Sequence, residues 1–208
     1  MARFSFEDIE QAFDEIDRAF TDSPQFECEP LSNMFNCRVI LKIETLNPIR
    51  SFKARGTELL TNRSDGKPMM CASAGNFGQA MAWSCRLRKI DLTVYGSVHA
   101  NPFKVSRMKE LGAKVIQQGD DFDTAKEIAR EIAAKNNIRL VEDSFDVETV
   151  IGAGTIGYEL GSIDTPIDMV PRSAWQWRSR ERDFRWDPKF SSRCEDRCSS
   201  IDQRFRDD

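Results

Sequence analysis

Short apolar runs alternate with amphipathic stretches between Met69 and Glu142, and this rhythm limits the possible folds more than any other feature of the chain. The apolar runs have the length of buried strands, and the stretches between them have the periodicity of helices. Alternating short strands and helices predict a parallel sheet with helices on both faces, which is an α/β fold. The expected strands are 69–72, 92–95, 114–117 and 139–142; the expected helices begin near Ala80, run from Asn101-Pro102 to Leu111, and run from Phe122 to Lys135.

Further elements are expected on either side of this region. Apolar residues along one face predict a helix from Phe4 to Phe20, with Ser5 or a neighbour as its cap. A loop at 21–30 and a strand at 37–43 should follow. Gly112 should end the helix before it, and residues 155–160 should form a last helix.

The stretch from Asn47 to Gly56, N-P-I-R-S-F-K-A-R-G, is centred on Lys53. Asn47-Pro48 cannot lie inside a helix, so we expect the helix to begin near Ser51 with Lys53 in its first turn. A lysine amine is a nucleophile only when part of it is neutral near pH 7, which burial or neighbouring cations promote. Arg50 and Arg55 are candidate cations, although taken alone Lys53 is typical of a surface lysine.

A second dense motif, S-A-G-N-F-G-Q, occupies Ser73–Gln79 and follows an expected buried strand. Strand, glycine-containing turn and helix N-terminus together form an anion site of backbone amides, assisted by the helix dipole. A substrate carboxylate suits such a site. Gly75 permits close approach of the backbone, and Asn76 offers both a donor and an acceptor.

The two motifs together resemble the serine/threonine dehydratase family of pyridoxal-phosphate (PLP) enzymes, part of the fold-type-II group that includes serine racemase and tryptophan synthase β. The resemblance implies that Lys53 forms the Schiff base with PLP and that Phe52 packs against the cofactor. It also implies that Asn76 bonds the ring oxygen of PLP. The substrate-binding residues that it implies are Ser73, Ala74, Gly75, Asn76 and Gln79.

The resemblance runs from about Phe4 to Pro171 and includes the segments N-P-F-K-V-S-R-M-K-E-L-G-A-K-V, D-S-F-D and V-I-G-A-G-T-I-G-Y-E-L. Ala153 stands where family members carry glutamine, and Phe77 stands where many carry histidine. Gly152 and Gly154 lack the full G-x-G-x-x-G pattern and its downstream acid, which excludes a dinucleotide motif.

The family architecture implies two α/β domains with PLP between them. Residues 1–46 would begin the large domain, 47–149 would form the small domain, and 150–171 would return to the large one. Residues 172–208 would stand apart as an aberrant tail.

Composition excludes several other classes of protein. A net charge of −4 argues against nucleic-acid binding over the whole chain, and no apolar run is long enough to span a membrane. The N-terminus is too acidic and polar for a secretory signal, so we expect a cytoplasmic protein. With His99 as the sole histidine, a Ser-His-Asp triad is not expected. No metal site is expected either, because Cys194 and Cys198 lack a matching pair.

The tail from Arg172 to Asp208 has a different composition from the rest. It contains no Leu, Val, Met or Gly, yet it holds three of the four tryptophans, and we expect it to be disordered. RNA binding is disfavoured because acidic residues nearly cancel the arginines. Reading one base later turns each tryptophan into glycine, and with permitted codon choices for the neighbouring residues Arg172–Ser179 can be read as V-P-L-G-N-G-A-L. That sequence resembles the family's phosphate-binding glycine loop, so the tail is interpreted as out-of-frame translation.

The expected activity is a PLP-dependent threonine or serine dehydratase that converts L-threonine into 2-oxobutanoate and ammonia, with a small amino acid as substrate. Racemisation, β-replacement and a threonine-synthase-like reaction remain open, as does a non-catalytic fragment of a frameshifted gene. A full-length relative is expected to be a homo-oligomer.

Overall fold

The computed structural model describes residues 4–143, 145–163, 167–168 and 170. Contacts divide the chain into a first compact unit that ends at Gly161 and a second that begins at Ser162. The following description concerns the first unit. The expectations for the tail from residue 172, including Cys194 and Cys198, lie outside the described residues.

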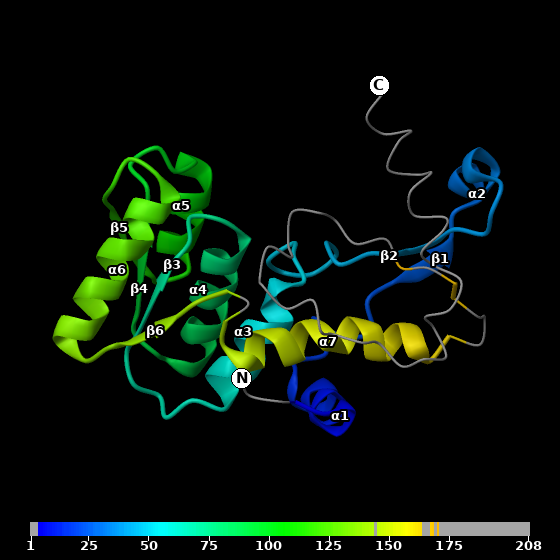
Figure 1. Ribbon diagram of the computed structural model, residues 1–208, viewed down its shortest axis with the longest axis horizontal. Helices are drawn as coiled ribbons and strands as arrows, with labels where there is room; N and C mark the ends of the chain where they lie inside the picture. Colours follow the sequence, from blue (N-terminus) through cyan, green and yellow to red (C-terminus); the bar gives the residue numbers. More distant parts are fainter. Residues whose placement is uncertain (1–3, 144, 164–166, 169, 171–208) are drawn as a thin grey trace. The chain divides into compact units, whose positions relative to one another are not determined.

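The predicted parallel sheet is confirmed. Its four strands, in the spatial order β5-β4-β3-β6, are β3 (Met69–Ala72), β4 (Leu92–Gly96), β5 (Lys114–Gln117) and β6 (Arg139–Val141) (Figure 1). Every neighbouring pair is parallel, and Cys71 on β3 stands opposite Val94 on β4 and Val141 on β6. All the strands therefore deliver their carboxyl ends to one edge of the sheet.

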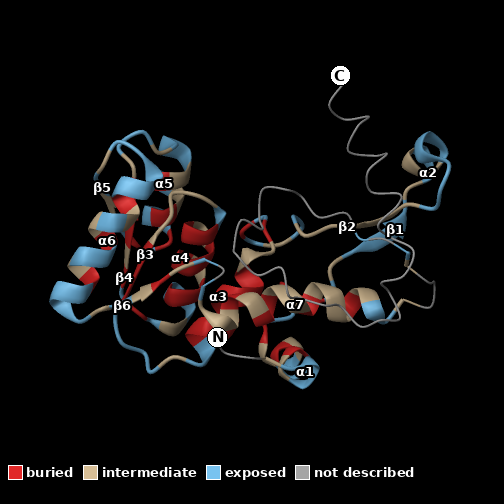
Figure 2. Cartoon of the chain, viewed as in Figure 1, coloured by how far each residue is buried: buried red, intermediate tan, exposed pale blue. Residues whose placement is uncertain are grey.

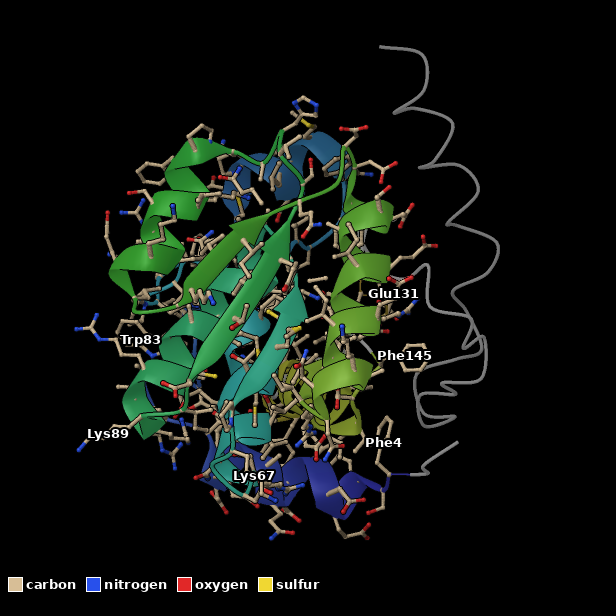
Figure 3. All side chains as sticks on the ribbon, turned by 90° about the vertical axis from the view of Figure 1, so that its left-hand side faces the viewer. Phe4, Lys67, Trp83, Lys89, Glu131 and Phe145 are labelled. Carbon is tan, nitrogen blue, oxygen red and sulfur yellow. The ribbon has the colours of Figure 1, made fainter. Side chains whose placement is uncertain are left out.

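Helices cover both faces of this sheet, as Figure 3 shows for the helices that carry Trp83 and Glu131. The helices are α4 (Asn76–Arg88) and α5 (Pro102–Glu110) on one face and α6 (Phe122–Asn136) on the other. Met69 and Cys71 face α4 and α5, whereas the alternate residue Met70 packs against α6. Side chains in a strand point alternately to opposite faces, so one apolar run supplies both cores. Burial also raises the pKa of the Cys85 thiol to about 12.

A second core lies where three further helices meet. They are α1 (Phe6–Glu15), α3 (Lys53–Asn62) and α7 (Val147–Gly161), and their core side chains include Ile9, Leu59 and Ile151. Helix α3 is buried from Ala54 to Thr61. A Cβ built on Gly152 would lie 2.5 Å from the Cα of Gly56, so the backbones of α3 and α7 nearly touch at this crossing.

The N-terminal hairpin differs in its burial. It consists of β1 (Gln25–Glu27), α2 (Glu29–Phe35) and β2 (Ile40–Lys42), with β1 and β2 antiparallel. No residue of these three elements is buried (Figure 2). The sequence prediction missed β1 and α2, which fall in or next to the expected loop 21–30, and the strand expected at 37–43 is shorter.

The helix expected from Phe4 to Phe20 ends at Glu15. Ser5 caps it as predicted, because its Oγ accepts the amide of Asp8 at 3.2 Å. Beyond the helix, the carboxylate of Asp17 accepts the amide of Ala19 at 2.8 Å, which favours a turn over another helical turn. Phe20 is nevertheless buried, so the apolar pattern correctly marked the core but misplaced the end of the helix.

Two other helices begin earlier than the sequence pattern predicted. Helix α4 begins at Asn76, four residues before the apolar pattern that predicted it, and α7 begins at Val147 rather than 155. Gly112 ends α5 as expected, with φ at +92°. Among the described residues, none of the helices has both the length and the apolar character needed to cross a membrane.

Candidate active site

The turn that precedes Lys53 is organised by the side chain of Asn47. Its Oδ1 accepts the amides of Ile49 and Ser51, both at 3.2 Å. Its Nδ2 donates to the carbonyl oxygens of Glu44 at 2.8 Å and Ser51 at 3.2 Å. One amide group thus satisfies four backbone groups of a turn that proline keeps out of the helix, and it fixes where α3 begins.

Lys53 is the first residue of α3, in the first turn as predicted. The helix begins two residues after Ser51, with Phe52 at the cap position, although the Ser51 hydroxyl still accepts the amide of Lys53 at 3.3 Å. The Lys53 Nζ lies 4.7 Å from the centre of the Phe52 ring. It also contacts both carboxylate oxygens of Asp143, at 2.9 and 2.8 Å. The lysine side chain is only 14% exposed.

Asp143 connects this lysine to the loop that carries the second motif. The register places Cys71 of β3 beside Val141 of β6, so the chain leaves both strands side by side, into Ser73 and Asp143 respectively. The Lys53 ammonium bound to Asp143 is therefore at the carboxyl edge of the sheet, next to the Ser73 loop. In open α/β sheets, ligands bind at this edge.

The loop itself joins β3 to the N-terminus of α4. Ser73 donates its amide to the carbonyl of Tyr95 at 3.0 Å, and its hydroxyl accepts the amide of Gly75 at 3.3 Å. Asn76 is the exposed first residue of α4, and Gln79 is half-buried one turn later. The first turn of a helix leaves amide N–H groups without carbonyl partners in the helix, and the helix dipole adds positive potential there. The loop can thus accept an anion.

Two glycines of the motif differ in their surroundings. A Cβ on Gly78 would lie 2.1 Å from the carbonyl oxygen of Ser73, so glycine is required for α4 to begin this close to the strand. A Cβ on Gly75 would meet only the Ser73 hydroxyl, at 3.8 Å. The space beside Gly75 is open to a ligand. The Lys53 amine, the open space beside Gly75 and the exposed side-chain amide of Asn76 lie at one edge of the sheet. An amine of this kind can bind an aldehyde cofactor, and the loop can bind an amino-acid substrate.

The two arginines proposed to act on Lys53 lie in different environments. Arg50 is exposed, and its φ of +57° places it in the left-handed region. Arg55 is fully buried and turned the other way, where Glu44 accepts from its Nε and Nη2 at 3.0 and 2.9 Å. Its Nη1 donates to Glu159 and, at 3.0 Å, to the Thr155 hydroxyl. Arg55 therefore pairs with two carboxylates and not with Lys53, whereas an influence of Arg50 on Lys53 stays a prediction.

Lys42 completes a buried group of four charges, because its Nζ lies 2.6 Å from Glu159 Oε2. Burial opposes ionisation of Glu159, but hydrogen bonds from Arg55 and Lys42 outweigh it, so the pKa of Glu159 lies below its ordinary value. We call Lys42, Glu44, Arg55 and Glu159 the buried ion network. It ties α3 to α7, to the last residue of β2 and to the chain just after that strand.

Sequence reasoning missed Asn47 and Asp143 as parts of the site. The Asn-Pro pair marks a turn, and asparagine side chains commonly bond their own backbone in turns, so a local signal for Asn47 existed. For Asp143 the signal was its position directly after an expected strand of a parallel sheet. Its partner Lys53 is 90 residues away, which no local pattern reveals.

Comparison with known proteins bears on what this site is. The sequence pattern of the family described as pyridoxal-phosphate dependent enzyme matches residues 16–171. The biosynthetic L-threonine dehydratase IlvA of Halalkalibacterium halodurans is 31% identical over 179 residues, which cover 82% of this chain and 43% of that protein. The chain thus spans less than half the length of this curated relative.

Solved structures agree with the sequence comparison. A pyridoxal 5'-phosphate-dependent aspartate racemase superposes with a TM-score of 0.69 and 26% identity over 77% of this chain and 52% of its own. A threonine deaminase from T.th. gives a TM-score of 0.68 and 26% identity over 76% of this chain and 51% of its own. The fold, the lysine at the sheet edge and the family match agree: this chain belongs to the pyridoxal-phosphate dependent enzyme family.

Proposed function

We propose that the protein to which this sequence belongs is a PLP-dependent ammonia-lyase acting on a β-hydroxy amino acid, with L-threonine as substrate. The observation that carries this proposal is the placement of the Lys53 amine beside the Ser73 loop at the carboxyl edge of the sheet. The similarity to a threonine dehydratase and a threonine deaminase supports the choice of substrate. Net conversion of threonine to 2-oxobutanoate releases one ammonia and conserves all other atoms.

The chain's own residues have separable roles in this proposal. Lys53 would hold the cofactor covalently and then move the proton at the substrate Cα. Phe52 would pack on the cofactor, and Asn76 would bond its ring oxygen. When bound, PLP supplies an electron sink for the bond broken at Cα.

The loop from Ser73 to Gly75, together with Asn76 and Gln79, would bind the substrate. A carboxylate there would accept amide N–H bonds at the start of α4, in the field of the helix dipole. The same residues suit racemisation, β-replacement or a threonine-synthase-like reaction, since all need a substrate carboxylate and a base at Cα. A racemase among the similar structures keeps that alternative in view.

We also propose the domain arrangement of the family, with 47–149 as the small domain and 1–46 and 150–171 as parts of the large one. The buried pair between Lys42 of the first part and Glu159 of the last, at 2.6 Å, supports a large domain that contains both parts. A cytoplasmic location and a homo-oligomeric full-length protein complete the proposal.

A second candidate is a non-catalytic fragment, which the limited span of the chain relative to its curated relative favours. Two measurements on the purified 208-residue chain separate the candidates. Borohydride reduction in the presence of PLP, followed by peptide mapping, should place the pyridoxyl group on Lys53 and not on Lys67, an 80% exposed lysine. A label spread evenly over surface lysines would contradict the proposed cofactor site.

Turnover of threonine to 2-oxobutanoate is the second measurement. A chain that labels specifically at Lys53 without turnover would be a cofactor-binding fragment of the enzyme. Lys53→Ala should abolish both signals, whereas Lys67→Ala should leave both unchanged. Turnover that survives in Lys53→Ala would show that another lysine holds the cofactor.

A further inference from the structure

The ion pair between Lys53 and Asp143 restrains the reactive amine, and we call it the Lys53–Asp143 latch. Both carboxylate oxygens approach Nζ within 2.9 Å, and the centre of the Phe52 ring lies 4.7 Å from the same nitrogen. Only 14% of the lysine side chain remains exposed. Asp143 and Phe52 thus occupy part of the space through which a reagent would approach the nitrogen.

Asp143 is presented by a hydrogen-bonded turn rather than by a loose segment. The Asp146 carboxylate accepts the amide of Glu142 at 2.9 Å, and the Glu142 carbonyl accepts the amides of Phe145 at 3.1 Å and Asp146 at 3.3 Å. Arg139 in turn holds Asp146 at 3.0 Å. The turn fixes the carboxylate at the sheet edge, directly beside the chain that leaves β3.

An ordinary surface ion pair in the same protein shows the difference. Lys67 and Asp65 are two residues apart, and their side chains are 80% and 61% exposed. Lys53 and Asp143 are 90 residues apart and join the start of α3 to the end of β6. The first pair is a local contact, whereas the second places a lysine at the edge where the substrate loop begins.

We propose that Asp143 is a positioning residue that holds the Lys53 amine at the sheet edge until an aldehyde displaces it, and so sets how fast the cofactor is captured. The proposal rests on the proposed function of Lys53. Condensation of the ammonium with an aldehyde forms one C–N double bond and releases one water and one proton. The nitrogen needs its lone pair for this bond, so its contacts with Asp143 must open first.

The test follows the rate at which PLP and cyanoborohydride, the hydride donor, label Lys53 in the intact 208-residue chain. Peptide mass spectrometry gives the rate at Lys53 relative to Lys109, an exposed lysine of α5. Asp143→Asn keeps the shape but removes the charge, and it should raise the relative rate about two- to fivefold, as expected for a partly exposed ion pair. Asp143→Glu should restore a rate near that of the unchanged chain.

Asp65→Asn is the matched control, because it removes a carboxylate from a lysine elsewhere and should leave the rate at Lys53 unchanged. Thermal unfolding checks that the variants fold, as expected for an exposed Asp143. Equal or slower labelling of Lys53 in Asp143→Asn, or equal rates in the Asn and Glu variants, would overturn the latch alone. Labelling of Lys53 no faster than Lys109 in every variant would overturn the proposed function together with it.

Discussion

Lys53 and Arg55 are two residues apart on α3, yet they lie in opposite environments. Lys53 points to the sheet edge and pairs with Asp143, which is 38% exposed. Arg55 is fully buried, and its partners Glu44, Glu159 and Thr155 are buried or half-buried. Successive positions on a helix point in different directions, so one turn can serve a site and a core at once.

The difference teaches where the rigidity of the site originates. A partly exposed ion pair contributes little to stability and can open, which suits an amine that must react. A buried network is costly to break, because removing one member leaves charges without compensation in a medium of low dielectric. Arg55 thus anchors the helix that Lys53 uses.

Removing Arg55 from the buried ion network should have the largest effect on the free energy of unfolding. Arg55→Ala leaves Glu44 and Glu159 facing a cavity with Lys42 as their remaining cation, and it should cost about 3–5 kcal/mol of unfolding free energy. Urea unfolding followed by circular dichroism measures this. Arg50→Ala, at an exposed arginine of the turn that precedes α3, is the control. A loss below about 1 kcal/mol at Arg55 would mean that the network does not anchor α3.

The crossing of α3 and α7 supports the same anchor. Gly152→Ala would place a Cβ 2.5 Å from the Cα of Gly56, so the helices must move apart, at an expected cost of about 1–3 kcal/mol. Gly161→Ala is the matched control on the same helix, because nothing lies within 4 Å of its added Cβ. The contrast between the two unfolding midpoints is the measurement. Equal midpoints would show that the crossing can relax.

Acid should weaken the buried network through Glu159. Its pKa in the folded chain lies below 4.5, so its contribution to stability is present above about pH 4.5 and is lost as the pH falls further toward the folded-state value. Glu159→Gln should be less stable than the unchanged chain at neutral pH, and this gap should narrow below pH 4.5. Thermal midpoints measured across that range test the sign. A gap that widens in acid would contradict it.

A substitution at the partly exposed Lys53 should change the free energy of unfolding least. Lys53→Ala removes a partly exposed ion pair and should change the unfolding free energy by no more than about 1 kcal/mol, while specific capture of PLP is lost. Lys67→Ala should change neither property. A large loss of stability in Lys53→Ala would erase the contrast between the two residues.

Much of the sheet could be predicted because its determinants are local. Apolar runs such as 69–72 are strands by length and flanking glycines, and all four expected strands are present. The strand, turn and helix start around Ser73 and the position of Lys53 in the first turn of its helix could be predicted for the same reason, because their signals are also local. The end of α1 was missed because the backbone becomes extended at Ile16 and a turn with an Asp17 hydrogen bond follows, while the apolar pattern continues to Phe20.

The remainder depends on contacts that are distant in sequence. Arg55 was interpreted as a neighbour of Lys53, but its direction is decided by Glu159, 104 residues away. Helix α2 and strand β1 bury nothing, so no hydrophobic period announces them. Single-sequence patterns report which residues are apolar, and they do not report which charged side chains will meet.

The near contact of α3 with α7 also has a consequence in time. Arg55 and its partner Thr155 are 100 residues apart, so a ribosome that adds about 5–20 residues per second completes α7 roughly 5–20 seconds after α3. Until then, Gly56, where the α7 backbone comes closest to α3, and the side chain of Arg55 face water or a chaperone instead of α7. The helix that carries the reactive lysine is therefore translated early but can pack against α7 only several seconds later.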